Sequence, residues 1–136
     1  MSLKENKTAI EDFSKAVELN EFYVDAFYNR GVCRMAIRDY KNAESDFSKA
    51  IEMFPEDKDS YLNRAFCKRK LSDNDGALID YNKAIQYGPK DGYAFYERGM
   101  FKIHLGDAYG ACHDLTRAND LGFWEAEEAL QNYCRY

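Results

Sequence analysis

Residues 28–57 read YNRGVCRMAIRDYKNAESDFSKAIEMFPED, and a related stretch, LNRAFCKRKLSDNDGALIDYNKAIQYGPKD, begins 34 residues later at Leu62. A third, YERGMFKIHLGDAYGACHDLTRANDLGFWE, begins after another 34 residues at Tyr96. An earlier partial copy, AIEDFSKAVEL from Ala9, aligns with AESDFSKAIEM from Ala43 at the same offset. Self-similarity at a fixed period is typical of proteins whose repeats stack on their neighbours. The predicted organisation is a single domain with a partial repeat at 1–23, full repeats at 24–57, 58–91 and 92–125, and a capping helix at 126–136.

Each repeat reads as two helices joined by a short turn. Asp39, Asp73 and Asp107 occupy equivalent places just before the second helix, where a carboxylate can accept hydrogen bonds from unpaired amide groups. Pro55 and Pro89 follow the second helices of the first two full repeats, and a residue without an amide hydrogen ends a helix. The pattern therefore predicts helix pairs throughout.

Small residues recur where two helices would touch, and large apolar residues lie between them. Because large and small residues alternate, the facing helix surfaces can interdigitate. The columns of small residues are Gly31, Ala65 and Gly99; Ala43, Ala77 and Ala111; and Ala16, Ala50, Ala84 and Ala118.

The pattern resembles a known family. Phe27-x-x-Arg30-Gly31, then Ala43-x-x-x-Phe47-x-x-Ala50, is similar to the tetratricopeptide repeat, a helix–turn–helix unit of 34 residues. The resemblance implies an all-α fold, a right-handed superhelical solenoid of antiparallel helix pairs, with the first helices lining a concave surface. Two columns depart from the family pattern: Arg30, Arg64 and Arg98 replace its usual Leu, and Arg34, Lys68 and Lys102 replace its usual Tyr.

The basic columns need a repeated partner. The two columns are four residues apart on each first helix and so share one face. The second helices carry an acidic column at the same period, Asp12, Asp46, Asp80 and Asp114. We therefore expect Arg30, Arg64 and Arg98 to bond to this aspartate column between packed helices, as a structural ladder rather than a ligand site.

The resemblance implies a non-catalytic protein–protein interaction module that binds a peptide or protein segment in its concave groove. The groove would be lined by side chains of the first helices, which differ from repeat to repeat. A subfamily binds chaperone tails through a basic clamp, but here only Asn63 agrees with that clamp, so such tails are disfavoured. The predicted groove residues are Tyr28, Asn29, Val32, Leu62, Asn63, Phe66, Lys70, Tyr96, Glu97, Met100 and His104.

Composition excludes several classes of protein. The formal net charge is −5, from 19 basic and 24 acidic residues, which argues against a nucleic-acid partner. No apolar stretch is long enough to span a membrane.

The four cysteines form no C-x-x-C pair, and we expect reduced thiols and a cytoplasmic location. Cys112 and His113 are adjacent and point about 100° apart on a helix, which argues against a catalytic Cys–His pair, so we expect no enzyme activity. The His and Cys residues show no recognised zinc spacing, so we expect no metal site, and we expect no cofactor.

The N-terminal helix raises an alternative. No first helix precedes it to cover Ile10, Phe13 and Val17, so this face could pair with a second copy of the chain as a homodimer. The competing function is a structural scaffold or oligomerisation segment of a larger repeat protein, with an empty groove.

Overall fold

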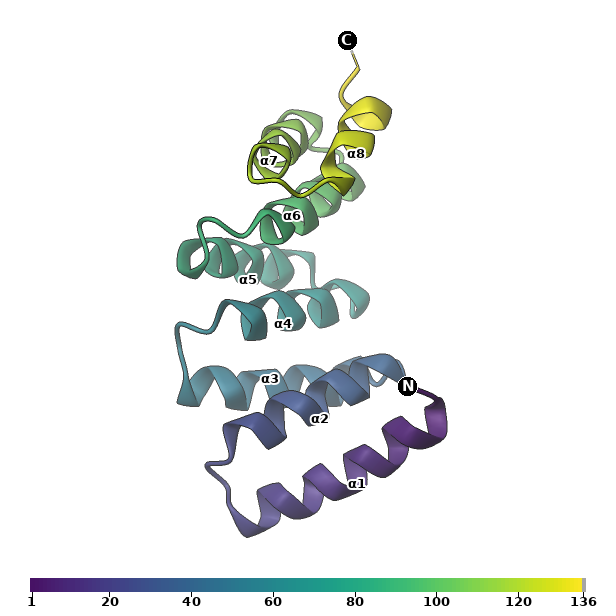
Figure 1. The fold of residues 1–136 in the computed structure, drawn as a ribbon, viewed down its shortest axis with the longest axis vertical. Coiled ribbons are helices and arrows are strands. Elements are labelled where there is room, and N and C mark those ends of the chain that lie inside the picture. The colour runs from purple at the N-terminus through teal and green to yellow at the C-terminus, as the bar shows by residue number, and fades with distance from the viewer. Residues whose placement is uncertain (136) are drawn as a thin grey trace. The chain divides into compact units, whose positions relative to one another are not determined.

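A computed structural model describes residues 1–135, and within this range the chain forms eight helices and no strand (Figure 1). The prediction of an all-α fold is confirmed. Tyr136, the last residue of the predicted cap, lies outside the described residues. The helices are α1 (Leu3–Leu19), α2 (Val24–Ala36), α3 (Tyr40–Met53), α4 (Lys58–Lys70), α5 (Asn74–Tyr87), α6 (Gly92–Leu105), α7 (Ala108–Asp120) and α8 (Glu125–Tyr133).

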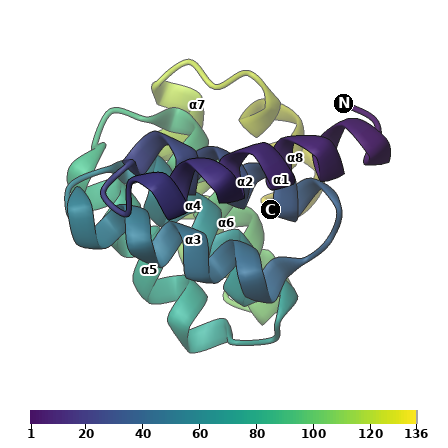
Figure 2. The same ribbon diagram turned by 90° about the horizontal axis from the view of Figure 1, so that it is seen from below.

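The chain divides into two compact units, Met1–Asp80 and a second unit that begins at Tyr81, so the division falls within α5. In the first unit α1 packs against α2, α2 against α3, and α3 against α4, and these neighbours can be followed in Figures 1 and 2. In the second unit α6 packs against α7 and α7 against α8. Each unit therefore consists of helices that contact their neighbours in sequence order.

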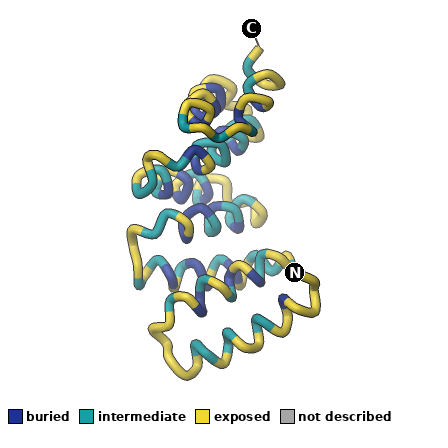
Figure 3. Tube along the Cα trace, viewed as in Figure 1, coloured by how far each residue is buried: buried dark blue, intermediate teal, exposed yellow. Residues whose placement is uncertain are grey.

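The predicted columns of small residues are buried except for Ala16 of α1, which is half-buried. Ala43, Ala65 and Ala111 are fully buried, and the buried faces alternate with exposed ones along each helix (Figure 3). A Cβ atom added to Gly31 would lie 2.9 Å from the Phe47 ring. Contacts this short leave no room for a side chain, so glycine allows α2 to approach α3 closely.

The turns within the repeats are built alike. The predicted aspartate caps are confirmed: Asp73 accepts a hydrogen bond from the Gly76 amide at 3.0 Å, and Asp107 accepts one from Gly110 at 2.9 Å. The residue just before each cap has left-handed backbone geometry, with φ of 64° at Arg38, 64° at Ser72 and 85° at Gly106. Of these three residues only Gly106 could be predicted to have this geometry, because glycine adopts it without steric cost. Arg38 and Ser72 give no such indication in the sequence.

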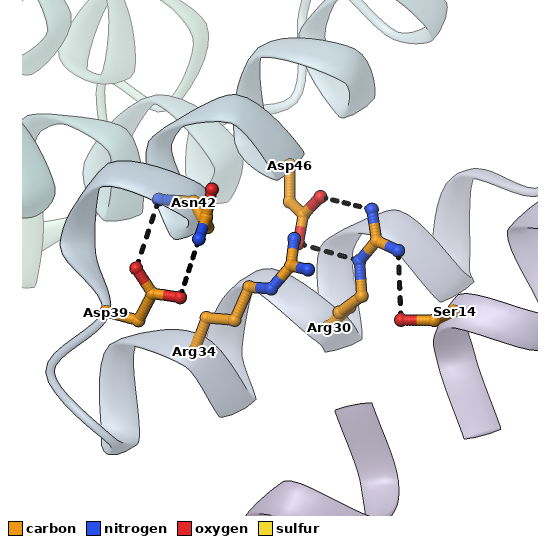
Figure 4. Close-up of polar contacts among 6 residues, drawn as sticks. All are labelled: Ser14, Arg30, Arg34, Asp39, Asn42 and Asp46. Atoms are coloured by element: carbon orange, nitrogen blue, oxygen red, sulfur yellow. Dashed lines mark hydrogen bonds and ion pairs between the residues drawn. The ribbon is translucent and has the colours of Figure 1, made fainter. Parts of the chain in front are cut away.

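A salt-bridge ladder joins first and second helices at three of the four predicted aspartates, Asp46, Asp80 and Asp114, whereas Asp12 is exposed and takes no part in it. The Arg30 guanidinium donates to both carboxylate oxygens of Asp46, at 3.0 and 2.7 Å, and to the Ser14 hydroxyl of α1 at 3.1 Å (Figure 4). Arg34 donates to the same aspartate at 2.8 Å. Asp46 is only 2% exposed, and its negative charge is compensated by the two arginines of α2.

The next two repeats reproduce this arrangement. Arg64 binds Asp80 through two bonds of 2.8 Å, and Arg98 binds Asp114 at 2.8 and 2.7 Å. Hydrogen bonding to Asp80 raises the pKa of the Arg64 guanidinium above its usual value. Such forked pairs fix both distance and orientation, so they set the register of one helix against the next.

We predict that Asp46→Asn lowers the free energy of unfolding by about 3 kcal/mol, because Arg30 and Arg34 lose the charge that compensates them inside the helix contact. Urea unfolding followed by circular dichroism measures the loss. The matched control is Glu52→Gln, which removes an exposed ion pair to Lys49 and should cost less than about 0.5 kcal/mol. Equal losses in the two variants would contradict a structural role for the ladder.

The C-terminal helix α8 packs against the helix that precedes it. Ala126 and Ala129 of α8 are buried, and α8 contacts α7. A disulfide between Cys112 of α7 and Cys134, just after α8, ties the two together across 22 residues. The expectation that all four cysteines are reduced thiols is therefore wrong for this pair, because the sequence spacing does not reveal that α8 folds back onto α7.

We predict that Cys134→Ser lowers the free energy of unfolding by about 3 kcal/mol, since the disulfide restricts the unfolded chain over 22 residues. Unfolding curves with and without a phosphine reductant measure the effect. Reductant should destabilise the unaltered chain and leave Cys134→Ser unchanged. An intact mass that corresponds to free thiols throughout would contradict the assignment.

Within residues 1–135, no helix combines the length and the apolar character needed to cross a membrane.

Candidate functional site

The first helices α2 and α4 lie side by side in the first unit. The Asn63 side-chain amide of α4 donates a hydrogen bond of 3.0 Å to the Tyr28 hydroxyl of α2. The Tyr28 ring packs edge-on against Phe47 of α3, with ring centroids 5.6 Å apart. Two residues predicted for the groove are thus joined directly, and one of them is anchored to the core.

The predicted groove residues of this unit differ in exposure. Asn29 and Lys70 are exposed and Val32 is 40% exposed, whereas Leu62 is buried. Phe66 is half-buried, and the Lys70 ammonium lies 5.4 Å from its ring centre. We call the surface formed by Asp25, Tyr28, Asn29, Val32, Asp59, Asn63, Phe66 and Lys70 the α2–α4 face.

A pocket of about 920 Å³ opens at one end of the α2–α4 face. This volume lies within the range of about 300–1,000 Å³ that is typical of ligand sites. The lining combines apolar groups with carboxylates from α2, α4 and the loop between α3 and α4. The lining residues are Val24, Asp25, Tyr28, Phe54, Pro55, Glu56, Asp57 and Asp59.

The loop that completes this pocket is not part of the predicted groove. Phe54 to Asp57 connect α3 to α4, and Phe54 is 58% exposed although it is a large apolar side chain. The sequence signal was Pro55, which we interpreted only as the end of a helix. An exposed phenylalanine beside that proline is the signal that could have identified the loop as part of a site.

Burial and nearby carboxylates both act on the Tyr28 phenol, which lines the pocket. Burial raises the pKa of Tyr28, and the negative charges of Asp59 and Asp57 raise it further. Lys58 pairs with Asp59 at 3.2 Å, and Asp57 accepts a hydrogen bond of 2.6 Å from the Ser60 hydroxyl. The Tyr28 hydroxyl is therefore neutral at physiological pH, and the pocket carries an excess of negative charge.

The second unit holds the remaining predicted groove residues on α6. Tyr96 and Met100 line a smaller pocket of about 310 Å³, which α8 and the residue before it complete with Trp124, Glu128 and Tyr133 among others. Tyr96 packs against Phe123 at 4.9 Å between ring centroids. Glu97 is half-buried and His104 is exposed. Here the C-terminal helix contributes to the same surface as the first helix, a role that its sequence alone did not indicate.

Comparison with known proteins identifies the repeat. The sequence profile of the tetratricopeptide repeat family matches residues 24–57, which are the first full repeat predicted from the sequence. Among curated proteins, none matches this chain. Residues 24–57 are thus a tetratricopeptide repeat.

Solved structures share the fold. A crystal structure of MamA has a TM-score of 0.83 at 15% identity, covering 88% of this chain and 70% of that one. A structure of MamA from Desulfovibrio magneticus RS-1, from residue 41 to the end, also has a TM-score of 0.83, at 19% identity, and the match covers 88% of this chain and 67% of that one. Another MamA crystal structure has a TM-score of 0.78 at 23% identity, and the match covers 96% of this chain and 69% of that one. These likenesses confirm the predicted fold class of tetratricopeptide-like helix pairs.

The thiol groups considered as nucleophiles are in unreactive environments. Cys112 is bonded to Cys134 and has no free thiol to pair with His113. Cys33 and Cys67 are buried, and burial raises the pKa of Cys67 to about 12. Within residues 1–135, no three His, Cys, Asp or Glu side chains are grouped so that they could hold a metal ion.

We predict that Cys67 resists alkylation by iodoacetamide at pH 8 in the folded chain, because its thiol is fully buried and, with a pKa of about 12, almost entirely protonated. Peptide mass spectrometry after alkylation reads out the modification. Unfolding in guanidinium should make the same thiol react fully. Rapid modification of Cys67 under native conditions would mean that α4 opens or that the thiolate is stabilised.

Proposed function

We propose that the α2–α4 face binds an extended segment of another protein. A tetratricopeptide repeat indicates an interaction or scaffold module, and the finer assignment to this face rests on one observation. The pocket of about 920 Å³ opens where α2, α4 and the α3–α4 loop meet, and its lining includes the exposed Phe54 and the half-buried Tyr28. Exposed aromatic groups beside polar ones are the kind of surface on which protein partners gain affinity.

The variation between repeats supports binding at this face. Val32, Phe66 and Met100 occupy equivalent positions in the three full repeats, yet differ in shape and chemistry. The ladder residues Arg30 and Asp46 have unchanged counterparts in each repeat and are already committed to helix packing. Side chains that differ from repeat to repeat and are only partly buried are therefore the ones available to a partner.

The peptide groups of a bound segment would find hydrogen-bonding partners on this face. The Asn29 amide is exposed, and Asn63 has an amide oxygen besides the amide nitrogen that binds Tyr28. An extended segment presents its own amide and carbonyl groups at regular intervals, so side-chain amides can bind it with little dependence on its sequence. Recognition of particular side chains then falls to the pocket.

We predict that peptides selected from a random library of 12-residue sequences against the whole chain bind to this face. Backbone amide signals of α2 and α4 should shift in NMR spectra as peptide is added. Val32→Gln should weaken binding about fivefold, since it removes apolar contact area from the middle of the face. Calorimetric titration measures the affinity.

Ile79→Gln provides the matched control, because Ile79 is a comparably exposed apolar residue on α5, outside the α2–α4 face, and should leave the affinity unchanged. Peptide-induced shifts confined to other helices would contradict the proposal. The scaffold alternative makes the opposite prediction: Ile10→Gln and Phe13→Gln would alter self-association measured by light scattering, and the changes on the α2–α4 face would have no effect.

A further inference from the structure

The pocket at the end of the α2–α4 face has an apolar part built from two segments. Val24 and Tyr28 come from α2, and Phe54 and Pro55 come from the loop that follows α3. Tyr28 is held in place by the Phe47 ring and by the Asn63 amide, so this part of the pocket is preformed. A preformed apolar surface can bury a bulky side chain of a partner without the entropic cost of ordering its own side chains.

Four carboxylates complete the lining of the same pocket. Asp25 lies in the first turn of α2, Glu56 and Asp57 lie in the loop, and Asp59 lies in the first turn of α4. No basic side chain is among the lining residues, and Lys58 nearby forms an ion pair with Asp59 at 3.2 Å. The field of Asp59 and Asp57 reaches the Tyr28 phenol, whose pKa is raised in part by these charges.

We propose that this pocket selects a cationic segment of a partner protein, in which a Lys or Arg side chain lies within two residues of a bulky apolar one. The inference rests on the proposed function and specifies the chemistry of the partner. The apolar side chain packs on Phe54 and Tyr28, and the cation lies among Asp25, Glu56 and Asp59. A long basic side chain suits such a site because its methylene groups pack on apolar surface while its charge remains near water.

Other occupants match the lining less well. A segment that ends in a free carboxylate, or carries acidic side chains, would place like charges against four carboxylates. A metal ion would leave the apolar half of the pocket unused, and these carboxylates do not form a group that could hold one. A phosphate backbone is repelled by the same charges.

The two parts of the pocket have different physical roles. Burial of the apolar side chain supplies most of the affinity, because exposed ion pairs in water contribute little. The carboxylates supply selectivity and speed of association, because they attract cationic segments and repel acidic ones. Asp25, Glu56 and Asp59 are exposed, so they keep most of their hydration when the pocket is empty, and their desolvation cost on binding is small.

Sequencing the peptides selected from the 12-residue library tests the chemistry directly. We expect Lys or Arg to be enriched next to bulky apolar residues. A synthetic peptide of the selected sequence should bind the triple variant Asp25→Asn, Glu56→Gln, Asp59→Asn about tenfold more weakly than the unaltered chain. The matched control neutralises three exposed carboxylates elsewhere, Glu11→Gln, Glu18→Gln and Glu52→Gln, and should retain the affinity.

Two further measurements keep the test independent of folding. Affinity for the unaltered chain should fall about tenfold between about 0.05 and 0.5 M sodium chloride, since salt screens the attraction. Replacing Asp25 and Asp59 together by Lys should reverse the preference, so that the acidic counterpart of the peptide binds better than the basic one.

The outcomes separate this inference from the proposed function. Neutral or acidic selected peptides that still shift the α2–α4 signals would overturn the inference and leave the proposed function standing. If the selected peptide binds the triple variant and its control with equal affinity, the inference is also overturned and the proposed function stands. If no selected peptide perturbs α2 or α4, the proposed function itself fails, and the inference fails with it. Binding of free spermine with the affinity of the basic peptide would show a site for charge alone and would also overturn the inference.

Discussion

A buried aspartate that must be neutralised by arginine governs how the helices of this chain pack. Asp46, Asp80 and Asp114 are each almost completely buried, and a carboxylate removed from water is tolerated only when cations and hydrogen-bond donors surround it. The forked geometry of the guanidinium group meets both carboxylate oxygens at once. Each repeat therefore has one favourable register between its first and second helix, and any slip along the helix axis would leave a charge uncompensated.

Because this contact is repeated, the rest of each first helix is free to vary. Gly31 and the buried alanines bring the helices close together, and the arginine pairs fix their positions. Exposed side chains outside these contacts, such as Asn29 and Val32, are not needed to hold the helices together. Other charged side chains of the chain take no part in this contact, including the carboxylates that line the pocket beside Phe54.

The second unit adds a different constraint at its C-terminal end. The disulfide ties the residue after α8 to α7, while the helix buries Ala126 and Ala129 against its neighbours. Together these contacts hold Trp124 and Tyr133 beside Tyr96, where they complete a small pocket. Helix α8, for which the sequence predicted only a capping role, therefore also lines this pocket together with α6.

Periodicity alone determined the helix pairs, the boundaries of the repeat at 24–57 and the arginine–aspartate ladder, since identical spacing places equivalent residues in equivalent contacts. Most of the pairing partners lie 16 residues apart within a repeat, a separation that a helical hairpin brings together. The residues of the disulfide and of the pocket do not recur: Cys112 has Glu44 and Leu78 as its counterparts, and Phe54 and Asp59 have Gly88 and Tyr93 in the next repeat. Periodicity therefore does not reveal these features, and they depend on how a particular loop or terminal helix folds back, which only the tertiary structure decides.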